Sequence, residues 1–133
     1  MPLPPAAVRR TVRVVLDGER AGAATVSVTF LSSQRMRAQN RRTFGRDRAT
    51  DVIAFGMRHD GHLVADLYVS PAAAAAAAAR FGVPPREEIV RLVIHGTLHA
   101  LGQDHPDGAS RVRSPMWQRQ ERYVQRAVRL RSR

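Results

Sequence analysis

Residues 84–102 read PPREEIVRLVIHGTLHALG, and this stretch decides the expected fold. Two prolines followed by two glutamates are typical of a helix start, where the macrodipole favours negative charge. The apolar run that follows is long enough for a buried helix, and Gly102 supplies a left-handed stop. The stretch therefore predicts a central helix that carries His95 and His99 within an otherwise apolar sequence.

The segments around this helix predict a mixture of helices and strands. Alternating β-branched and apolar residues predict strands near 25–31, 51–55 and 63–69. Helical spacing and capping residues predict helices near 5–16, 33–43, 71–79 and 115–130. Residues 12–16 also alternate like a strand, and we favour the helix there. The first of these helices is expected to end before a turn at Asp17 and Gly18. We therefore expect a single α+β domain, in which a small mixed sheet of three to four strands packs with about five helices.

Length and composition narrow the class of protein. A chain of 133 residues suits one domain, and its 44% hydrophobic and 25% charged residues are typical of a globular protein with a packed core. Because there is no cysteine, any metal ion must be held by histidine or carboxylate. No secretory signal and no apolar run of transmembrane length is present, so we expect a cytoplasmic protein with no membrane segment.

The positive charge is concentrated in two stretches. The chain has 22 basic and 11 acidic residues, for a net charge of +11. Residues 35–48 hold six Arg and one Asp, and residues 111–133 hold eight Arg and one Glu. Such clusters suit a polyanion such as nucleic acid, because each Arg on a phosphate releases counterions. The alternative is a solvated basic face, and charge alone does not decide between the two.

Three histidines have the spacing of a metal site. His95 and His99 lie four residues apart on the predicted helix, so both project from one face. His105 follows just beyond Gly102, where a returning loop could supply a third imidazole. Three ligands would leave one tetrahedral position open for water, as in catalytic rather than structural zinc sites. The alternative is an accidental pair of helical histidines, and the third histidine argues against it.

The segment HGTLHALGQDH, residues 95–105, resembles the signature H-G-x-L-H-x-x-G-x-D-H of the YbeY-type endoribonucleases, also called rRNA maturation factors. NRRTFGRDRATDVIAF, residues 40–55, is similar to a second block of that family, and VADLYVS, residues 64–70, occupies the place of a family strand. The likeness covers residues 25–125 approximately. The N-terminus looks shorter than usual, so the family's first strand could be absent, which would leave three strands or an irregular edge.

The resemblance implies a zinc-dependent, single-strand-specific endoribonuclease that processes rRNA, including the 3′ end of 16S rRNA, and acts in ribosome quality control. One Zn²⁺ per chain would be held by His95, His99 and His105, with nickel as the alternative metal. The expected partners are single-stranded rRNA and the ribosome or its small subunit, and a ribosome-associated GTPase partner is left open.

Several side chains are candidates for roles at the site, and only the first of these roles comes from the same resemblance. Arg41 matches an arginine implied to be catalytic, and its guanidinium could hold a phosphate oxygen. Arg42 and Arg46 are candidates for contacts to the RNA backbone. Asp104 precedes the third histidine and would either orient a ligand or stabilise the loop. Trp117 could stack on a base or belong to the core.

Two rival functions remain open from the sequence. A metalloprotease also holds zinc with histidines four residues apart, but its general base is a Glu directly after the first histidine, where this chain has Gly96. The other rival is a non-catalytic ribosome assembly factor whose metal only stabilises the fold. An open three-ligand site argues against a purely structural metal.

Overall fold

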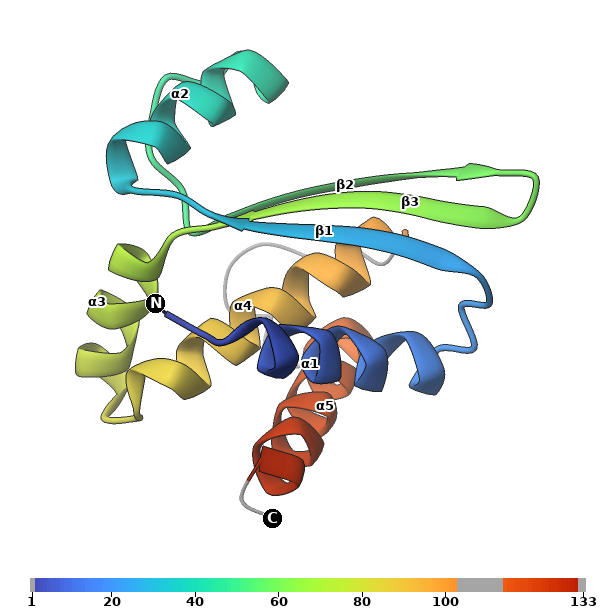
Figure 1. Ribbon diagram of the computed structural model, residues 1–133. Coiled ribbons are helices and arrows are strands. Elements are labelled where there is room, and N and C mark those ends of the chain that lie inside the picture. Colours follow the sequence, from blue (N-terminus) through green and yellow to red (C-terminus); the bar gives the residue numbers. More distant parts are fainter. Residues whose placement is uncertain (1, 103–113, 132–133) are drawn as a thin grey trace.

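A computed structural model describes residues 2–102 and 114–131 of the chain. The described residues form five helices and three strands, and the last three helices follow the last strand (Figure 1). The elements are α1 (Pro5–Gly18), β1 (Ala24–Phe30), α2 (Ser33–Phe44), β2 (Val52–His59), β3 (His62–Val69), α3 (Pro71–Phe81), α4 (Pro85–Ala100) and α5 (Pro115–Arg131). This arrangement confirms the expected α+β class, with the sheet at its lower expected size.

The three strands form a mixed sheet in the order β1-β3-β2. β1 runs parallel to β3, whereas β2 and β3 form an antiparallel hairpin. The hairpin turns at Asp60 and Gly61, whose φ angles of 52° and 78° are those that a tight turn between twisted strands requires. The register places Leu67 of β3 opposite Val28 of β1 and Ala54 of β2, at the centre of the sheet.

α4 is the core helix of the protein. It contacts α1, α3, α5, β2 and β3, and most of its residues are buried. Figure 1 shows α1, α3, α4 and α5 on one side of the sheet, whereas α2 lies on the other side, at the end where β3 finishes. Apolar residues at alternate positions of β3, such as Leu63 and Leu67, face α4 and are almost fully buried. The buried helix expected from residues 84–102 is confirmed, and Gly102 has the positive φ of 94° that ends it.

The end of α1 differs from the expectation. We expected a turn at Asp17 and Gly18, but α1 continues through Gly18. A Cβ at Gly18 would lie 2.3 Å from the Tyr123 hydroxyl of α5, so this glycine allows two helices to approach closely. The Tyr123 hydroxyl donates to Glu19 across 2.5 Å. Burial and the hydrogen bond to Glu19 raise the pKa of Tyr123 to about 12, so this tyrosine belongs to the core.

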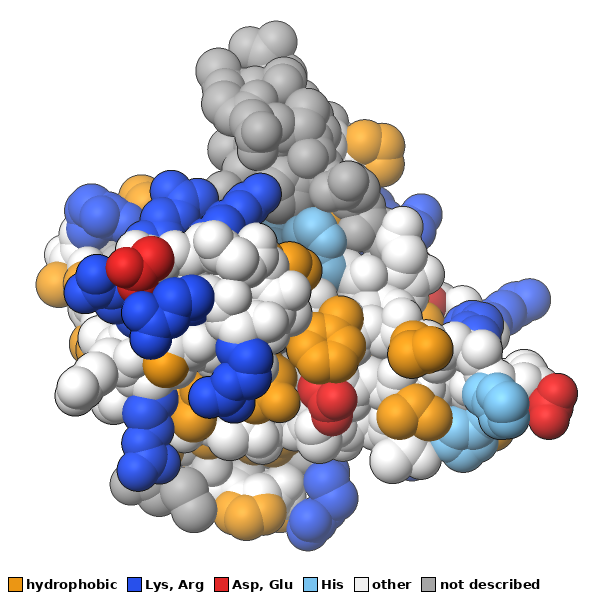
Figure 2. All heavy atoms as spheres, turned by 90° about the horizontal axis from the view of Figure 1, so that it is seen from above, with side chains coloured by type: hydrophobic (Ala, Val, Ile, Leu, Met, Phe, Trp, Pro, Cys, Tyr) orange, Lys and Arg blue, Asp and Glu red, His pale blue; other side chains and the backbone are white. Residues whose placement is uncertain are grey.

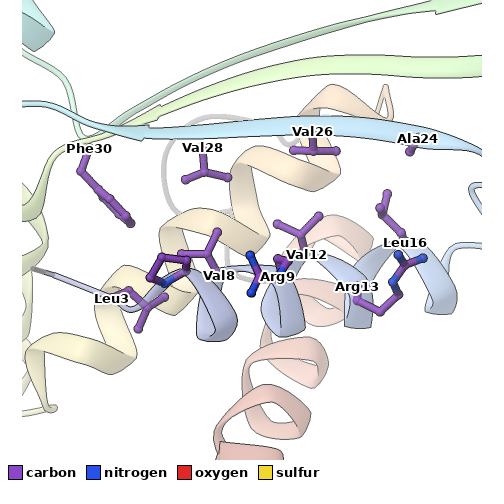
Figure 3. A pocket seen from close by; sticks show the side chains of 11 residues that line it. Leu3, Val8, Arg9, Val12, Arg13, Leu16, Ala24, Val26, Val28 and Phe30 are labelled. Atoms are coloured by element: carbon purple, nitrogen blue, oxygen red, sulfur yellow. The ribbon is translucent and has the colours of Figure 1, made fainter.

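An apolar groove of about 430 Å³ runs between α1 and β1 (Figure 3). The groove faces β1, which is an edge strand of the described sheet. Two guanidiniums, those of Arg9 and Arg13, are its charged groups, and the other side chains that line it are hydrocarbon. A groove of this composition has no group for acid, base or metal chemistry, so it is not a candidate active site. Its apolar lining is formed by Leu3, Pro5, Val8, Val12, Leu16, Ala24, Val26, Val28 and Phe30.

Candidate metal centre

His95 and His99 lie on one face of α4, as the sequence predicts. Their ring centroids are 4.6 Å apart and the ring planes are inclined by 67°. His95 is buried and His99 is half-buried. Because both imidazoles project from successive turns on one face of a core helix, their nitrogens can reach a common ion with little loss of conformational freedom.

Gln120 of α5 fixes the orientation of His95. The Oε1 atom of Gln120 lies 2.7 Å from Nδ1 of His95, and Gln120 is almost fully buried. The Nε2 group of Gln120 donates to Glu121 across 3.0 Å, which determines which end of the amide faces the histidine. The amide oxygen therefore accepts from Nδ1–H of His95. In the neutral ring, Nε2 then carries the lone pair that a metal ion binds.

A buried ion-pair cluster holds Glu121 in place. The guanidinium of Arg91 on α4 donates two hydrogen bonds of 2.9 Å to the Glu121 carboxylate, and it also pairs with Glu87 and Glu88. Burial alone would lower the pKa of Arg91, but its hydrogen bonds and charge interactions with Glu121 and Glu88 outweigh this effect and raise it. Arg91 thus stays charged. Contacts from Arg91 to Glu121, from Glu121 to Gln120 and from Gln120 to His95 connect this partly buried cluster to the histidine pair.

Gly96 explains how α4 comes close enough to the sheet. A Cβ at this position would lie 3.0 Å from Leu67 and 3.2 Å from Val52. The residue after His95 therefore faces the sheet, not the histidine pair. A glutamate here, as in the metalloprotease motif, would have to enter the core.

The two described histidines fit a metal ion by their chemistry and position. Both are imidazole donors on one helix face, and Gln120 gives His95 the hydrogen bond that metal-ligating histidines usually make through their second nitrogen. Among residues 2–102 and 114–131, no group of three His, Cys, Asp or Glu side chains gathers. His105, the third predicted ligand, and Asp104 lie outside the described residues, so these predictions stay untested.

The predicted phosphate-binding arginines lie on α2 and in the loop that follows it. Arg41 is exposed, and its guanidinium lies 3.5 Å from the Asp47 carboxylate. Arg37 binds the same carboxylate with two hydrogen bonds, and its guanidinium lowers the pKa of Asp47. Arg42 and Arg46 are exposed as well. Figure 2 shows basic side chains gathered at the end of the molecule that α2 occupies in Figure 1. Their catalytic and RNA-binding roles stay predictions.

Two residues that the sequence reasoning missed are structurally important here. Asn40 is buried on α2, and its Nδ2 group donates to the Arg48 carbonyl across 3.0 Å, which fixes the loop after the helix. Gln120 could have been noticed because it lies at a core position of α5, one turn after Met116 and one turn before Val124, both buried. A polar residue on an apolar helix face indicates a buried hydrogen-bond partner.

The fold and the histidine pair define a class of protein: a small α+β protein that presents two neighbouring imidazole side chains from a buried helix. Residues 5–128 match the family described as endoribonuclease YbeY, and the chain belongs to this family. No helix in the described ranges is both long and apolar enough to cross a membrane.

Individual relatives agree with this assignment. The chain is 31% identical to an endoribonuclease YbeY of Chlorobaculum tepidum, over 86% of this chain and 82% of the relative. It is 32% identical to that of Chlorobium phaeovibrioides, over 92% and 81% of the two chains. A solution structure of a Thermotoga maritima protein matches with a TM-score of 0.63 and 28% identity, covering 94% of this chain and 82% of that chain. The family resemblance noted in the sequence is therefore confirmed.

Proposed function

We propose that this protein is a metal-dependent endoribonuclease that cleaves single-stranded RNA. The observation that carries the proposal is the pair of adjacent imidazoles on α4, His95 and His99, with Gln120 bound to Nδ1 of the first. Membership of a family described as endoribonuclease supports the reaction class. The metal is expected to be zinc, with nickel as the alternative, and His105 is the proposed third ligand.

Different residues of the chain would bind the metal ion, orient its ligand and bind the phosphate during phosphodiester hydrolysis. His95 and His99 would hold the metal ion, and Gln120 would keep the His95 ring in one orientation. When bound, the ion supplies a Lewis acid and acidifies a water molecule. Arg41 would bind a non-bridging phosphate oxygen and stabilise the negative charge that grows on the phosphate. An incoming phosphate would then compete with Asp47 for this guanidinium.

The basic stretches would bind the RNA backbone at two separate places. α2 lies on one side of the sheet, whereas α5 lies among the helices on the other side (Figure 1). The two stretches therefore do not form one continuous flat surface. Arg42 and Arg46 would contact phosphates next to Arg41, and the arginines of α5 would bind a more distant part of the strand.

A protease reaction is disfavoured by the position of Gly96. In a metalloprotease the residue after the first helical histidine carries the general base. Here that position faces Leu67 and Val52 of the sheet, so no side chain of glutamate size fits there. A non-catalytic assembly factor is the remaining alternative, and it differs from the proposal in having no cleavage activity.

The biological setting follows from the family resemblance. We propose that the substrate is rRNA, including the 3′ end of 16S rRNA, and that the protein acts in rRNA processing and ribosome quality control in the cytoplasm. The small ribosomal subunit would be its principal partner, and a ribosome-associated GTPase a further one.

One experiment separates the proposal from both rivals. Purified protein loaded with zinc, or in parallel with nickel, is incubated with end-labelled single-stranded rRNA fragments, with the same fragments annealed to a complement, and with casein. The proposal requires internal cleavage of the single strand, much slower cleavage of the duplex and intact casein. Cleaved casein would support the protease, and inert protein with both RNA and casein would support the assembly factor.

A further inference from the structure

A second pocket opens directly beside His95. It has a volume of about 540 Å³ and lies between α3, α4 and α5, with His95 and Gln120 in its wall. This volume is within the range of roughly 300–1,000 Å³ that is typical of small-molecule sites. The pocket therefore adjoins the candidate metal centre and is large enough for part of a substrate.

The charge of this pocket does not suit a phosphate. Three carboxylates line it, those of Asp51, Glu88 and Glu121, against the guanidiniums of Arg80 and Arg91. The Arg91 guanidinium already binds both Glu88 and Glu121. Because the carboxylates outnumber the cations, a phosphate would meet net repulsion, whereas a neutral group with N–H donors would find acceptors.

Aromatic rings line the same pocket. Trp117 from the first turn of α5 is half-buried, and Phe81 at the end of α3 is 67% exposed. The Arg80 guanidinium lies 5.3 Å from the centroid of the Phe81 ring. Exposed aromatic faces and an arginine plane are the surfaces on which unpaired bases stack. An exposed phenylalanine otherwise has an unfavourable contact with water, which a stacked ring would remove.

We propose that this pocket binds one unpaired nucleobase of the RNA strand, next to the phosphate that is cleaved. The inference rests on the proposed nuclease function and deepens it. The base would stack on Phe81 or Trp117, and its N–H groups would donate to the carboxylates of Asp51 or Glu121. Because a paired base cannot enter a pocket, this subsite gives a physical reason for preferring single strands over duplexes.

Trp117 makes a direct test possible, because it is the single tryptophan of the chain. The full-length protein is titrated with AMP or UMP while tryptophan fluorescence is recorded, and ribose 5-phosphate serves as the probe that has the phosphate but no base. The proposal predicts saturable quenching by the nucleotides and none by ribose 5-phosphate. Equal responses to all three probes, or no response to any, would overturn it.

A matched pair of variants locates the bound base. Phe81→Leu should weaken AMP binding at least about fivefold, because it removes a stacking face. Phe44→Leu changes an exposed phenylalanine of α2 that does not line the pocket, and it should leave AMP binding unchanged. Equal affinities of the two variants would overturn the assignment of Phe81.

RNA cleavage measured on the same samples keeps this proposal separate from the proposed function. Cleavage without quenching would overturn the base pocket and leave the nuclease intact. Quenching without cleavage would support the base pocket and contradict the nuclease.

Discussion

Gln120 on α5 accepts a hydrogen bond from the Nδ1 group of His95 on α4 across 2.7 Å. Twenty-five positions separate the two residues in the sequence, and their contact fixes both the orientation and the tautomer of the histidine. Glu121 accepts a hydrogen bond from the Gln120 amide, and Arg91 binds Glu121. A network of polar side chains therefore supports the orientation of His95.

Replacing this glutamine tests the role of the network. Gln120→Met keeps the volume of the side chain but removes the acceptor, so the His95 ring should lose its single tautomer. We expect metal affinity to fall about 10- to 100-fold, as measured by competition with a chelator. Ring ¹⁵N shifts of His95 in metal-free protein report the tautomer independently. Gln125→Met, an exposed position on the same helix, is the control. Unchanged affinity and tautomer in Gln120→Met would show that the contact has no positioning role.

The Arg91 cluster makes a separate prediction about stability. Arg91→Met would leave Glu87, Glu88 and Glu121 close together without their shared cation. Because its side chain is only 17% exposed, we expect the free energy of unfolding to fall by about 3–5 kcal/mol, measured by urea denaturation. Arg10→Met, which removes an exposed arginine from α1, should change stability by less than about 0.5 kcal/mol. Similar losses of stability in both variants would mean that the Arg91 cluster contributes no more to stability than an exposed arginine does.

Gly96 should be needed for packing even though alanine is a better helix former. Gly96→Ala gains about 0.5–1 kcal/mol in helix propensity. Its new methyl group would, however, lie 3.0 Å from the fully buried Leu67, and overpacking of this kind typically costs about 1–3 kcal/mol. We therefore expect lower stability in urea denaturation, together with weaker metal binding because the His95 turn moves. If Gly96→Ala were more stable than the wild type, the sheet would be able to accommodate the added methyl group without a loss of packing energy.

Arg41 tests whether binding and catalysis can be separated. Arg41→Ala should keep its metal content and its melting temperature, because Arg41 is exposed and ligates no metal in the proposal. Loss of a donor to the phosphate should slow RNA cleavage about 10²- to 10³-fold, whereas RNA affinity falls far less. Arg9→Ala on α1 serves as the control for loss of one positive charge. Cleavage at the wild-type rate would remove Arg41 from the site.

Local patterns in the sequence were sufficient to predict most of the fold. The apolar run of residues 84–102 predicts α4, because a helix buried on most sides has a nearly continuous apolar sequence. The alternation in residues 63–69 predicts β3, because a strand buried on one face has apolar residues at every second position. The end of α1 could not be predicted, since Gly18 is required by the approach of Tyr123 and not by a turn. Contacts between residues far apart in the chain leave no local pattern.

The candidate site was predictable only in part for the same reason. The spacing of His95 and His99 places both on one helix face whatever the rest of the fold does. The contact of Gln120 with His95, and the pocket formed by α3, α4 and α5, depend on how helices pack together. The ion pair of Arg41 with Asp47 is likewise created by the fold of a loop.

The proposed function requires that the histidine pair of α4 holds a metal ion that is needed for RNA cleavage. The most direct measurement determines metal equivalents by elemental analysis and cleavage of labelled single-stranded RNA on the same samples of wild type, His99→Ala and His59→Ala. His59 lies exposed at the tip of the β2–β3 hairpin and is the matched histidine control. We expect about one metal ion per chain and RNA cleavage in the wild type and His59→Ala, and loss of both in a folded His99→Ala. Full metal content or wild-type cleavage in His99→Ala would contradict it.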